Sequence, residues 1–138
     1  MTDRDIRWKQ RFNNFDRAFI LLREIRDQGF DSLPQISKEG VIQRFEYTYE
    51  LAWKTLKDYL EGLGVNVQPI APRTVIKAAF VAGVIHDGQV WIDMMNHRNQ
   101  LSHSYDFKVF EEVLRAIDER YFAAFERLHD DLLSQTIL

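Results

Sequence analysis

Apolar residues in the first fifth of the chain recur at steps of three and four, and this spacing constrains the fold more than any other feature. Between Ile6 and Asp27 they form one stripe: Trp8, Phe12, Phe15, Phe19, Leu22 and Ile25. An α-helix turns once every 3.6 residues, so residues spaced in this way fall on one face. The spacing predicts an amphipathic helix that ends near Gly29.

The same period continues and predicts further helices. A second helix is expected from near Ser37 to Gly62 or Gly64. Its apolar residues form two adjoining stripes, so it is expected to lie between neighbours on both sides. A short third helix is expected to begin at Pro72 and to end at Gly83, because proline suits a first turn and glycine a helix end.

A fourth helix is expected from near Asp87 into the segment that follows Arg98. Asp106 is predicted to cap a last helix that extends to about Gln135. Apolar residues of this helix step alternately by four and three, as in a bundle seam: Phe110, Leu114, Ile117, Tyr121, Ala124 and Leu128. The predicted fold is therefore an all-α, up-down helical bundle of four long helices and one short helix.

Length and composition limit the class of protein. The chain has 138 residues, of which 46% are hydrophobic, and this suits a single domain over residues 1–138 with its own core. Cysteine is absent, which excludes disulfides, Cys-based zinc sites and a cysteine nucleophile, and fits the cytoplasm. The net charge of -3 argues against a broadly basic surface for nucleic acid. No run of about 18 apolar residues is present, so no membrane span is expected.

Two residues break the amphipathic pattern. Phe122 lies among charged residues on the polar side of the last helix, which indicates either a contact with another subunit or a singly exposed aromatic residue. Arg98 takes an apolar place in the fourth helix, between Met95 and Leu101. A guanidinium cannot stay buried and unpaired, so we expect it to face a cleft, a partner surface or a buried acid, for which Glu46 is a candidate.

The segment from Arg98 to Tyr105 carries most of the chemistry in the sequence. The imidazole of His103 has an ordinary pKa of about 6.5, so it can accept or donate a proton near neutral pH. Arg98 offers a fixed charge and two parallel donors for phosphate oxygens. Together they could cleave RNA without a metal ion: the 2′-oxygen loses its proton, attacks the adjacent phosphate, and the leaving 5′-oxygen is protonated. DNA lacks that hydroxyl and would be spared.

The spacing of Arg98 and His103 raises a geometric question. On a continuous helix, five residues place them about 140° apart. Either the helix ends near Ser102 and His103 turns back toward Arg98, or the two residues serve different surfaces. The polar residues ahead of Asp106 favour a helix end. Two chains that met here would offer two histidines and two arginines, so we expect the site at a homodimer interface.

Each of these residues also has a purely structural interpretation. Arg98 could interact with the carbonyl groups at the end of its own helix. His103 could be an ordinary linker histidine, and Tyr105 a core aromatic residue with its hydroxyl satisfied.

Other groups of polar residues give weaker indications of a functional site. Asp93 and His97 lie one helical turn apart and could contact one metal ion, but no third ligand follows at a recognisable spacing, so no metal and no cofactor are predicted. His86 and His129 have no evident partners and are expected to face solvent. A glycine-rich phosphate loop is absent, so the chain is not expected to be a nucleotidyltransferase itself.

The pattern Arg98-x4-His103-x-Tyr105 resembles the Arg-x4-His-x-Tyr signature of HEPN domains. The stretches Arg44–Gly64 and Ala71–Asp106 resemble the HEPN subgroup named nucleotidyltransferase substrate-binding proteins. The resemblance covers nearly the whole chain and is weakest at its two ends.

The resemblance implies a homodimeric helical bundle that is paired with a small nucleotidyltransferase. In one view of such proteins, the helical partner is a substrate-binding subunit of the transferase. In the other it is a toxin, a metal-independent ribonuclease with Arg98 and His103 in the dimer cleft and with Asn99 orienting Arg98. The transferase is then the antitoxin, and it adds AMP to Tyr105. One departure is His97, which stands where an acidic residue is expected before the motif arginine.

Three interpretations therefore stay open: a ribonuclease toxin, a non-catalytic subunit that binds a nucleotide or the transferase at the same cleft, and a purely structural dimeric module. The acidic net charge favours the second, because extended contacts with RNA need a positive field.

Overall fold

The first helix forms where its apolar stripe predicts. In a computed structural model that describes residues 2–103 and 106–137, α1 (Asp3–Asp27) begins three residues before the expected start. Thr2 caps it: its hydroxyl accepts from the Asp5 amide at 3.2 Å, and the Asp5 carboxylate accepts from the Thr2 amide at 3.1 Å. Five members of the stripe are buried and Ile25 is half-buried. Gly29, at a φ of 83°, ends the turn after the helix.

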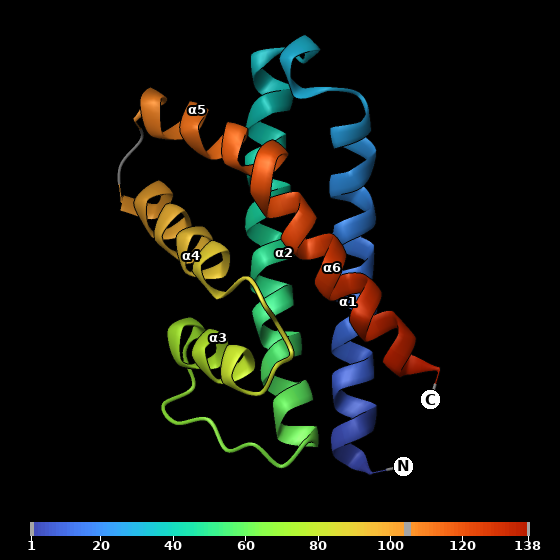
Figure 1. The fold of residues 1–138 in the computed structure, drawn as a ribbon. Coiled ribbons are helices and arrows are strands. Elements are labelled where there is room, and N and C mark those ends of the chain that lie inside the picture. The colour runs from blue at the N-terminus through green and yellow to red at the C-terminus, as the bar shows by residue number, and fades with distance from the viewer. Residues whose placement is uncertain (1, 104–105, 138) are drawn as a thin grey trace.

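The second helix lies between neighbours on both sides, as expected. A short 3₁₀ turn, η1 (Phe30–Ser32), leads into α2 (Gln35–Gly62), which starts directly after Pro34. Its two apolar stripes are buried in one core: Val41, Ile42, Phe45, Tyr49, Ala52, Trp53, Leu56 and Leu60. With α1 it forms an antiparallel hairpin (Figure 1).

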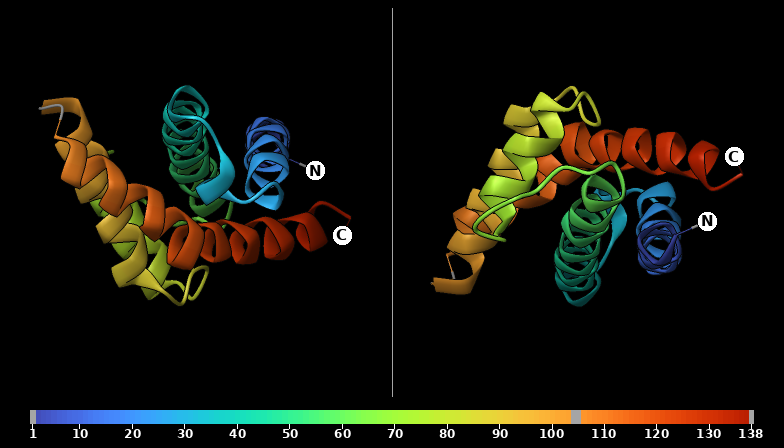
Figure 2. Two further views of the ribbon diagram at one scale, coloured as in Figure 1. Left: turned by 90° about the horizontal axis from the view of Figure 1, so that it is seen from above. Right: turned by 90° about the horizontal axis from the view of Figure 1, so that it is seen from below.

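Two shorter helices lie on the side of α2 that faces away from α1 (Figures 1 and 2). The first packs against α2, and the second packs against the first and against the last helical segment. They are α3 (Pro72–Val81) and α4 (Gly88–His103). Pro72 occupies the first turn of α3, and Gly83 follows its end at a φ of 75°. The indole of Trp91 donates to the Asp87 carboxylate at 3.1 Å, which fixes the start of α4 against the core.

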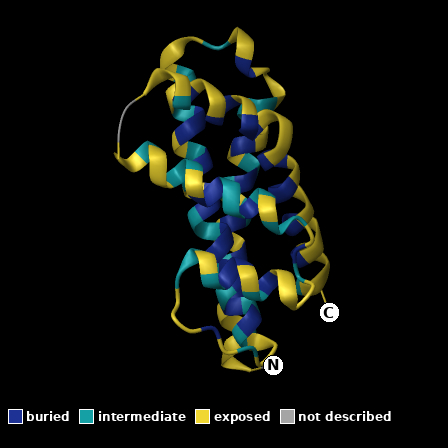
Figure 3. Ribbon diagram, turned by 60° about the vertical axis from the view of Figure 1, so that its left-hand side comes forward, coloured by how far each residue is buried: buried dark blue, intermediate teal, exposed yellow. Residues whose placement is uncertain are grey.

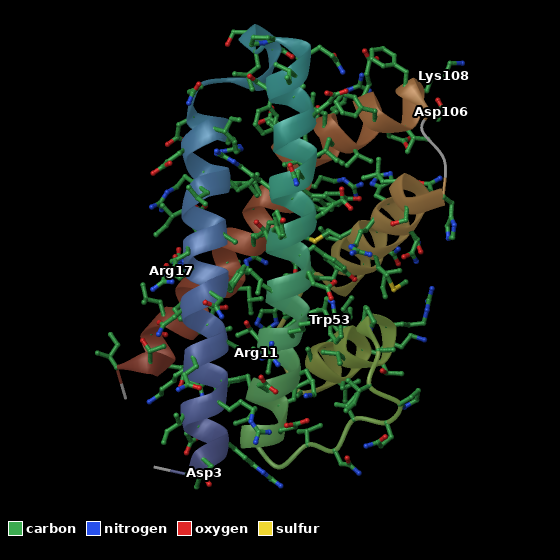
Figure 4. The ribbon with its side chains drawn as sticks, turned by 180° about the vertical axis from the view of Figure 1, so that it is seen from behind. Asp3, Arg11, Arg17, Trp53, Asp106 and Lys108 are labelled. Atoms are coloured by element: carbon green, nitrogen blue, oxygen red, sulfur yellow. The ribbon has the colours of Figure 1, made fainter. Side chains whose placement is uncertain are left out.

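The last helical segment crosses the α1–α2 hairpin obliquely (Figure 1). It consists of α5 (Phe107–Ala116), the single π-helical turn η2 (Ile117–Tyr121) and α6 (Phe122–Thr136). Asp106 caps α5 as predicted, by accepting from the Lys108 amide at 2.8 Å, and both residues lie at the outer end of α5 (Figure 4). α5 contacts α2 and α4, whereas α6 contacts α1.

Buried residues line the inner faces of these helices, and the outward faces are exposed (Figure 3). All six residues of the predicted seam on the last helix are buried. The predicted all-α bundle is thus confirmed. No helix among the described residues is both long enough and apolar enough to cross a membrane.

The expectation that Phe122 is exposed or contacts another subunit is wrong. Its side chain is only 3% exposed, stacks on Phe19 at a centroid distance of 5.2 Å, and lies under the guanidinium of Arg26 at 4.4 Å. The cause is the π turn, in which the Phe122 amide donates to the Ile117 carbonyl five residues back. The extra residue rotates the following chain by about 100°, so Phe122 turns into the core. Burial of its ring contributes about 2 to 3 kcal/mol.

The expectation that His129 faces solvent is also wrong. The residue is 6% exposed and its ring stacks on Phe19 at 4.5 Å. Its Nε2 atom lies 2.6 Å from Asp16 and its Nδ1 atom 3.0 Å from Asp130, so both ring nitrogens are paired. Asp16 is 113 residues away in the chain, which is why sequence spacing could not identify it. His86 is exposed, as expected.

Candidate functional site

The described part of the predicted motif lies on the last turns of α4. The helix continues through His103, one residue beyond the expected end at Ser102, and the Ser102 hydroxyl donates to the Arg98 carbonyl at 3.1 Å. Because the helix is continuous, Arg98 and His103 project about 140° apart. The expected return of His103 toward Arg98 is therefore not made within one chain. Tyr105, the predicted site of modification, lies outside the described residues.

Arg98 points toward α2, where it meets acidic side chains. Its Nη2 atom lies 3.9 Å from the Glu50 carboxylate, and its charge also acts on Glu46. The side chain is 35% exposed, but its Nε atom is buried and has no hydrogen-bond partner among the described residues. Of the expected settings for this guanidinium, the structure places an acid beside it, but that acid is Glu50 rather than Glu46, and the Glu50 side chain is 33% exposed rather than buried.

The carboxylates of Glu46 and Glu50 differ in their burial and in their hydrogen-bond and ion-pair partners. Burial raises the pKa of Glu46, and the charge of Arg98 only partly offsets this. Glu50 is held more firmly, because it accepts from the Trp53 indole at 3.1 Å and contacts the Lys54 ammonium at 3.2 Å. Arg98 therefore shares a carboxylate that other donors already hold, so its own contact is long and easily exchanged.

Tyr49 completes this buried polar cluster. Its hydroxyl is buried and has no hydrogen-bond partner in the described part of the chain. Burial, together with the charge of Glu50, raises the pKa of Tyr49, so the phenol stays protonated. Two buried polar atoms, the Nε atom of the Arg98 guanidinium and the Tyr49 hydroxyl, thus have no hydrogen-bond partner among the described residues. Such unsatisfied buried atoms are costly and call for an explanation.

His103 and Asn99 differ from Arg98 in their exposure to solvent. Both are exposed on α4. An exposed imidazole at a helix end can reach a ligand or a second chain, whereas the side chain of Arg98 is only partly exposed.

A third set of polar residues lies on the α4 face that meets α5 and η2. The hydroxyl of Tyr121 is 2.6 Å from His97 Nδ1, and His97 Nε2 is 3.3 Å from Glu112. Burial raises the pKa of Tyr121, so its phenol keeps the proton and we assign it as the donor to Nδ1. In its neutral form His97 then carries its own proton on Nε2, facing Glu112.

The possible metal pair of Asp93 and His97 is engaged elsewhere. Asp93 accepts from Arg120 at 2.9 Å and from Gln89 at 2.9 Å. Burial would raise the pKa of Asp93, but these hydrogen bonds outweigh it and hold the pKa below its usual range. The two side chains thus serve different networks.

Sequence reasoning missed the partners of His97. Tyr121 was assigned to the core seam, which is correct for its ring but left its hydroxyl without a partner. Glu112 lies 15 residues from His97, across a helix junction. The only signal available was His97 itself, as a departure from the acidic residue expected there.

Comparison with known proteins identifies the family. Residues 10–134 match the model of the family described as nucleotidyltransferase substrate binding protein like. The chain belongs to this family. A Haemophilus influenzae relative named probable ribonuclease HepT is 32% identical over 123 residues, which make up 80% of this chain and 84% of the relative.

Two solved structures share the fold of this family member. One, from Haemophilus influenzae, is described as revealing the fold of a substrate binding domain of a nucleotidyltransferase. It matches with a TM-score of 0.75 and 28% identity, over 88% of this chain and 98% of its own. The other, from Thermus thermophilus, matches with a TM-score of 0.70 and 26% identity, over 88% of this chain and 97% of its own. The family resemblance drawn from the sequence is therefore confirmed.

The two acids beside Arg98 should respond in opposite ways to neutralisation. Because burial raises the pKa of Glu46, the folded state binds its proton more tightly than the unfolded chain does. The stability linked to that proton is present at low pH and is lost as the pH rises through the raised pKa. We therefore expect Glu46→Gln to raise the Tm at pH 7 and to leave it near the wild-type value at pH 4, in thermal melts followed by circular dichroism.

Glu50→Gln, one turn further along α2, is the matched control. It weakens the contacts with Trp53, Lys54 and Arg98, so it should lower the Tm at pH 7. A Glu46→Gln variant that is less stable than the wild type at pH 7 would show that Glu46 is a stabilising partner of Arg98 and not a desolvated acid.

Proposed function

We propose that this protein is a metal-independent endoribonuclease toxin that a partner nucleotidyltransferase holds in check. The observation that carries the proposal is the setting of Arg98: a guanidinium loosely held at 3.9 Å by a shared carboxylate, five residues before an exposed His103. The relative named probable ribonuclease HepT supports it. RNA as substrate would place the protein in the cytoplasm.

The proposed chemistry uses the two side chains in complementary roles. The His103 imidazole removes the proton from the 2′-hydroxyl, and that oxygen attacks the neighbouring phosphate. The bond to the 5′-oxygen breaks as this oxygen takes up a proton, leaving a cyclic phosphate. The Arg98 guanidinium donates to the phosphate oxygens as negative charge builds on them. Asn99, next to Arg98 on the exposed side of α4, is proposed to support this arrangement. No step needs a cofactor.

The helical geometry favours a site completed by a second copy. Within one chain the guanidinium and the imidazole lie about 140° apart on α4, too divergent to grip one phosphate. His103 is exposed, and by the helical period it lies on a different face of α4 from Arg98, so it can enter a groove formed with another molecule. We therefore propose a homodimer in which Arg98 of one protomer works with His103 of its partner.

The proposed control acts through Tyr105. AMP on this side chain would lie two residues from His103 and would bring a phosphate charge and a bulky nucleoside into the site. Both charge repulsion and blockage would oppose entry of an RNA phosphate. The partner transferase would thus act as the antitoxin.

A second function is favoured by a specific observation. The family description and the Haemophilus influenzae structure both refer to substrate binding for a nucleotidyltransferase. Under this alternative, Arg98 and His103 bind a nucleotide or the transferase and no RNA is cut.

Loss of either motif side chain should abolish cleavage. We expect the purified protein to cut cellular RNA in the presence of a chelator, and Arg98→Ala or His103→Ala to reduce the rate by at least about 100-fold. His86→Ala, which alters an exposed histidine elsewhere, is the control and should keep full activity. If the wild type binds the transferase or a nucleotide but never cuts RNA, the second function holds instead.

Tyr105→Phe should separate cleavage from its control. With the partner transferase and ATP, the wild type should lose activity and the phenylalanine variant should keep it. Tyr47→Phe, at a tyrosine that is 60% exposed on α2, should remain sensitive to the transferase. A Tyr105→Phe protein that the active transferase still silences would exclude AMP addition at this residue as the mechanism.

A further inference from the structure

A groove of about 370 Å³ lies between α4 and the helical junction formed by α5 and η2. Neither Arg98 nor His103 lines it. Its walls are polar side chains with Ala116 among them: Asp93, Asn96, His97, Gln100, Glu112, Arg115, Glu119 and Arg120. This groove therefore needs an explanation separate from the motif itself.

The groove runs along the edge of α4 that leads to His103. Asn96 and His103 are seven residues apart, so on α4 they point in directions that differ by only about 20°. Gln100 lies between them along the helix and also lines the groove. A chain that placed a phosphate at His103 could thus place a neighbouring nucleotide here.

The walls of the groove are held in place by buried or paired groups. Arg120 is fixed to Asp93 at 2.9 Å, and Tyr121 is fixed to His97 at 2.6 Å. Both partners on this side come from the π turn, whose extra residue sets their directions. Single π turns in α-helices are frequent at functional sites.

The charges in the groove disfavour a phosphate and favour a base. Asp93 pairs with Arg120, and Glu112 faces the Nε2 proton of His97 in its neutral form. The two carboxylates of Glu112 and Glu119 then stand against the single guanidinium of Arg115, so the net charge of the groove is negative. A phosphate would meet net repulsion. A neutral ring that both donates and accepts hydrogen bonds would not, and guanidinium planes also stack on bases.

We propose that this groove binds a guanine base of single-stranded RNA beside the bond that is cut. Guanine offers donors at N1 and N2 on one edge and acceptors at O6 and N7 on another. A carboxylate matches the first edge, and a guanidinium matches the second. Glu119 and Arg115, both exposed and both lining the groove, supply this pair. Asn96 and Gln100 supply further amide donors and acceptors.

As a substrate preference, this inference rests on the proposed ribonuclease function, but base binding can be measured without cleavage. The full-length protein is titrated with guanosine, guanosine 5′-monophosphate and the 5′-monophosphates of adenosine, cytidine and uridine. The readout is the side-chain amide signals of Asn96 and Gln100 in NMR spectra. We expect saturable shifts with the guanine compounds, with guanosine binding no more weakly than its monophosphate.

Variants then connect the shifts to the groove. Arg115→Ala and Glu119→Gln should each weaken guanosine binding by about tenfold or more. Arg127→Ala and Glu126→Gln, at exposed positions on α6 outside the groove, should leave it unchanged. Cleavage sites in RNA should lie next to guanine in the wild type and should lose that preference in the two groove variants.

The outcomes separate the inference from the proposed function. If RNA is cut without base preference and guanosine shows no saturable shift, the guanine site is excluded and the ribonuclease stands. If guanosine binds through Arg115 and Glu119 but RNA is never cut, the guanine site is confirmed and the proposed ribonuclease function is excluded. Equal affinity for all four nucleotides, or tighter binding of the monophosphate than of guanosine, would overturn the assignment of a guanine base.

Discussion

The unbroken helical period of α4 is the constraint on which the candidate site depends. One helix carries three polar side chains that face different ways: Arg98 faces α2, His97 faces the junction of α5 and η2, and His103 is exposed at the helix end. Their directions follow from the 3.6-residue turn and not from any adjustable loop. This divergence is the reason for the proposal that Arg98 works with the His103 side chain of a second copy of the chain.

The setting of Arg98 is suited to exchange of partners. A fully satisfied buried ion pair would hold a guanidinium in place, and breaking it would cost several kcal/mol. Here the contact to Glu50 is long, Glu50 is already held by Trp53 and Lys54, and the Nε atom has no partner among the described residues. An incoming phosphate could add hydrogen bonds without destroying a strong one.

Where apolar spacing alone decides the structure, the sequence was sufficient. The stripe of α1 and the seam of the last helix follow the helical period, and the buried residues match it. The predicted exposure was wrong for Phe122 and His129. Both residues follow a π turn, which no local sequence pattern predicts. The extra residue widens the buried face after the turn, so that Phe122 and His129 are buried together with the seam residues Ala124 and Leu128. The pairing of His129 with Asp16 adds a contact between distant parts of the chain.

The candidate site, too, was predictable from the sequence only in part. The place of Arg98 in an apolar stripe predicted that it would face a cleft, a partner surface or a buried acid, and the structure places it 3.9 Å from the partly exposed carboxylate of Glu50. Which acid takes that role depends on side-chain reach between α2 and α4, and the sequence pointed to Glu46 instead of Glu50. The contacts of His97 with Tyr121 and Glu112 depend on how α4 packs on the last helix, which helical periodicity does not specify.

The claim that Arg98 and His103 act from different protomers can be tested with mixed dimers. Differently tagged Arg98→Ala and His103→Ala chains are co-expressed, and the heterodimer is purified through both tags. It should contain one intact pair and recover about half of the wild-type ribonuclease activity, whereas each variant homodimer is inactive. A heterodimer as inactive as the two homodimers would contradict this account, because it would show that the two residues act within one chain.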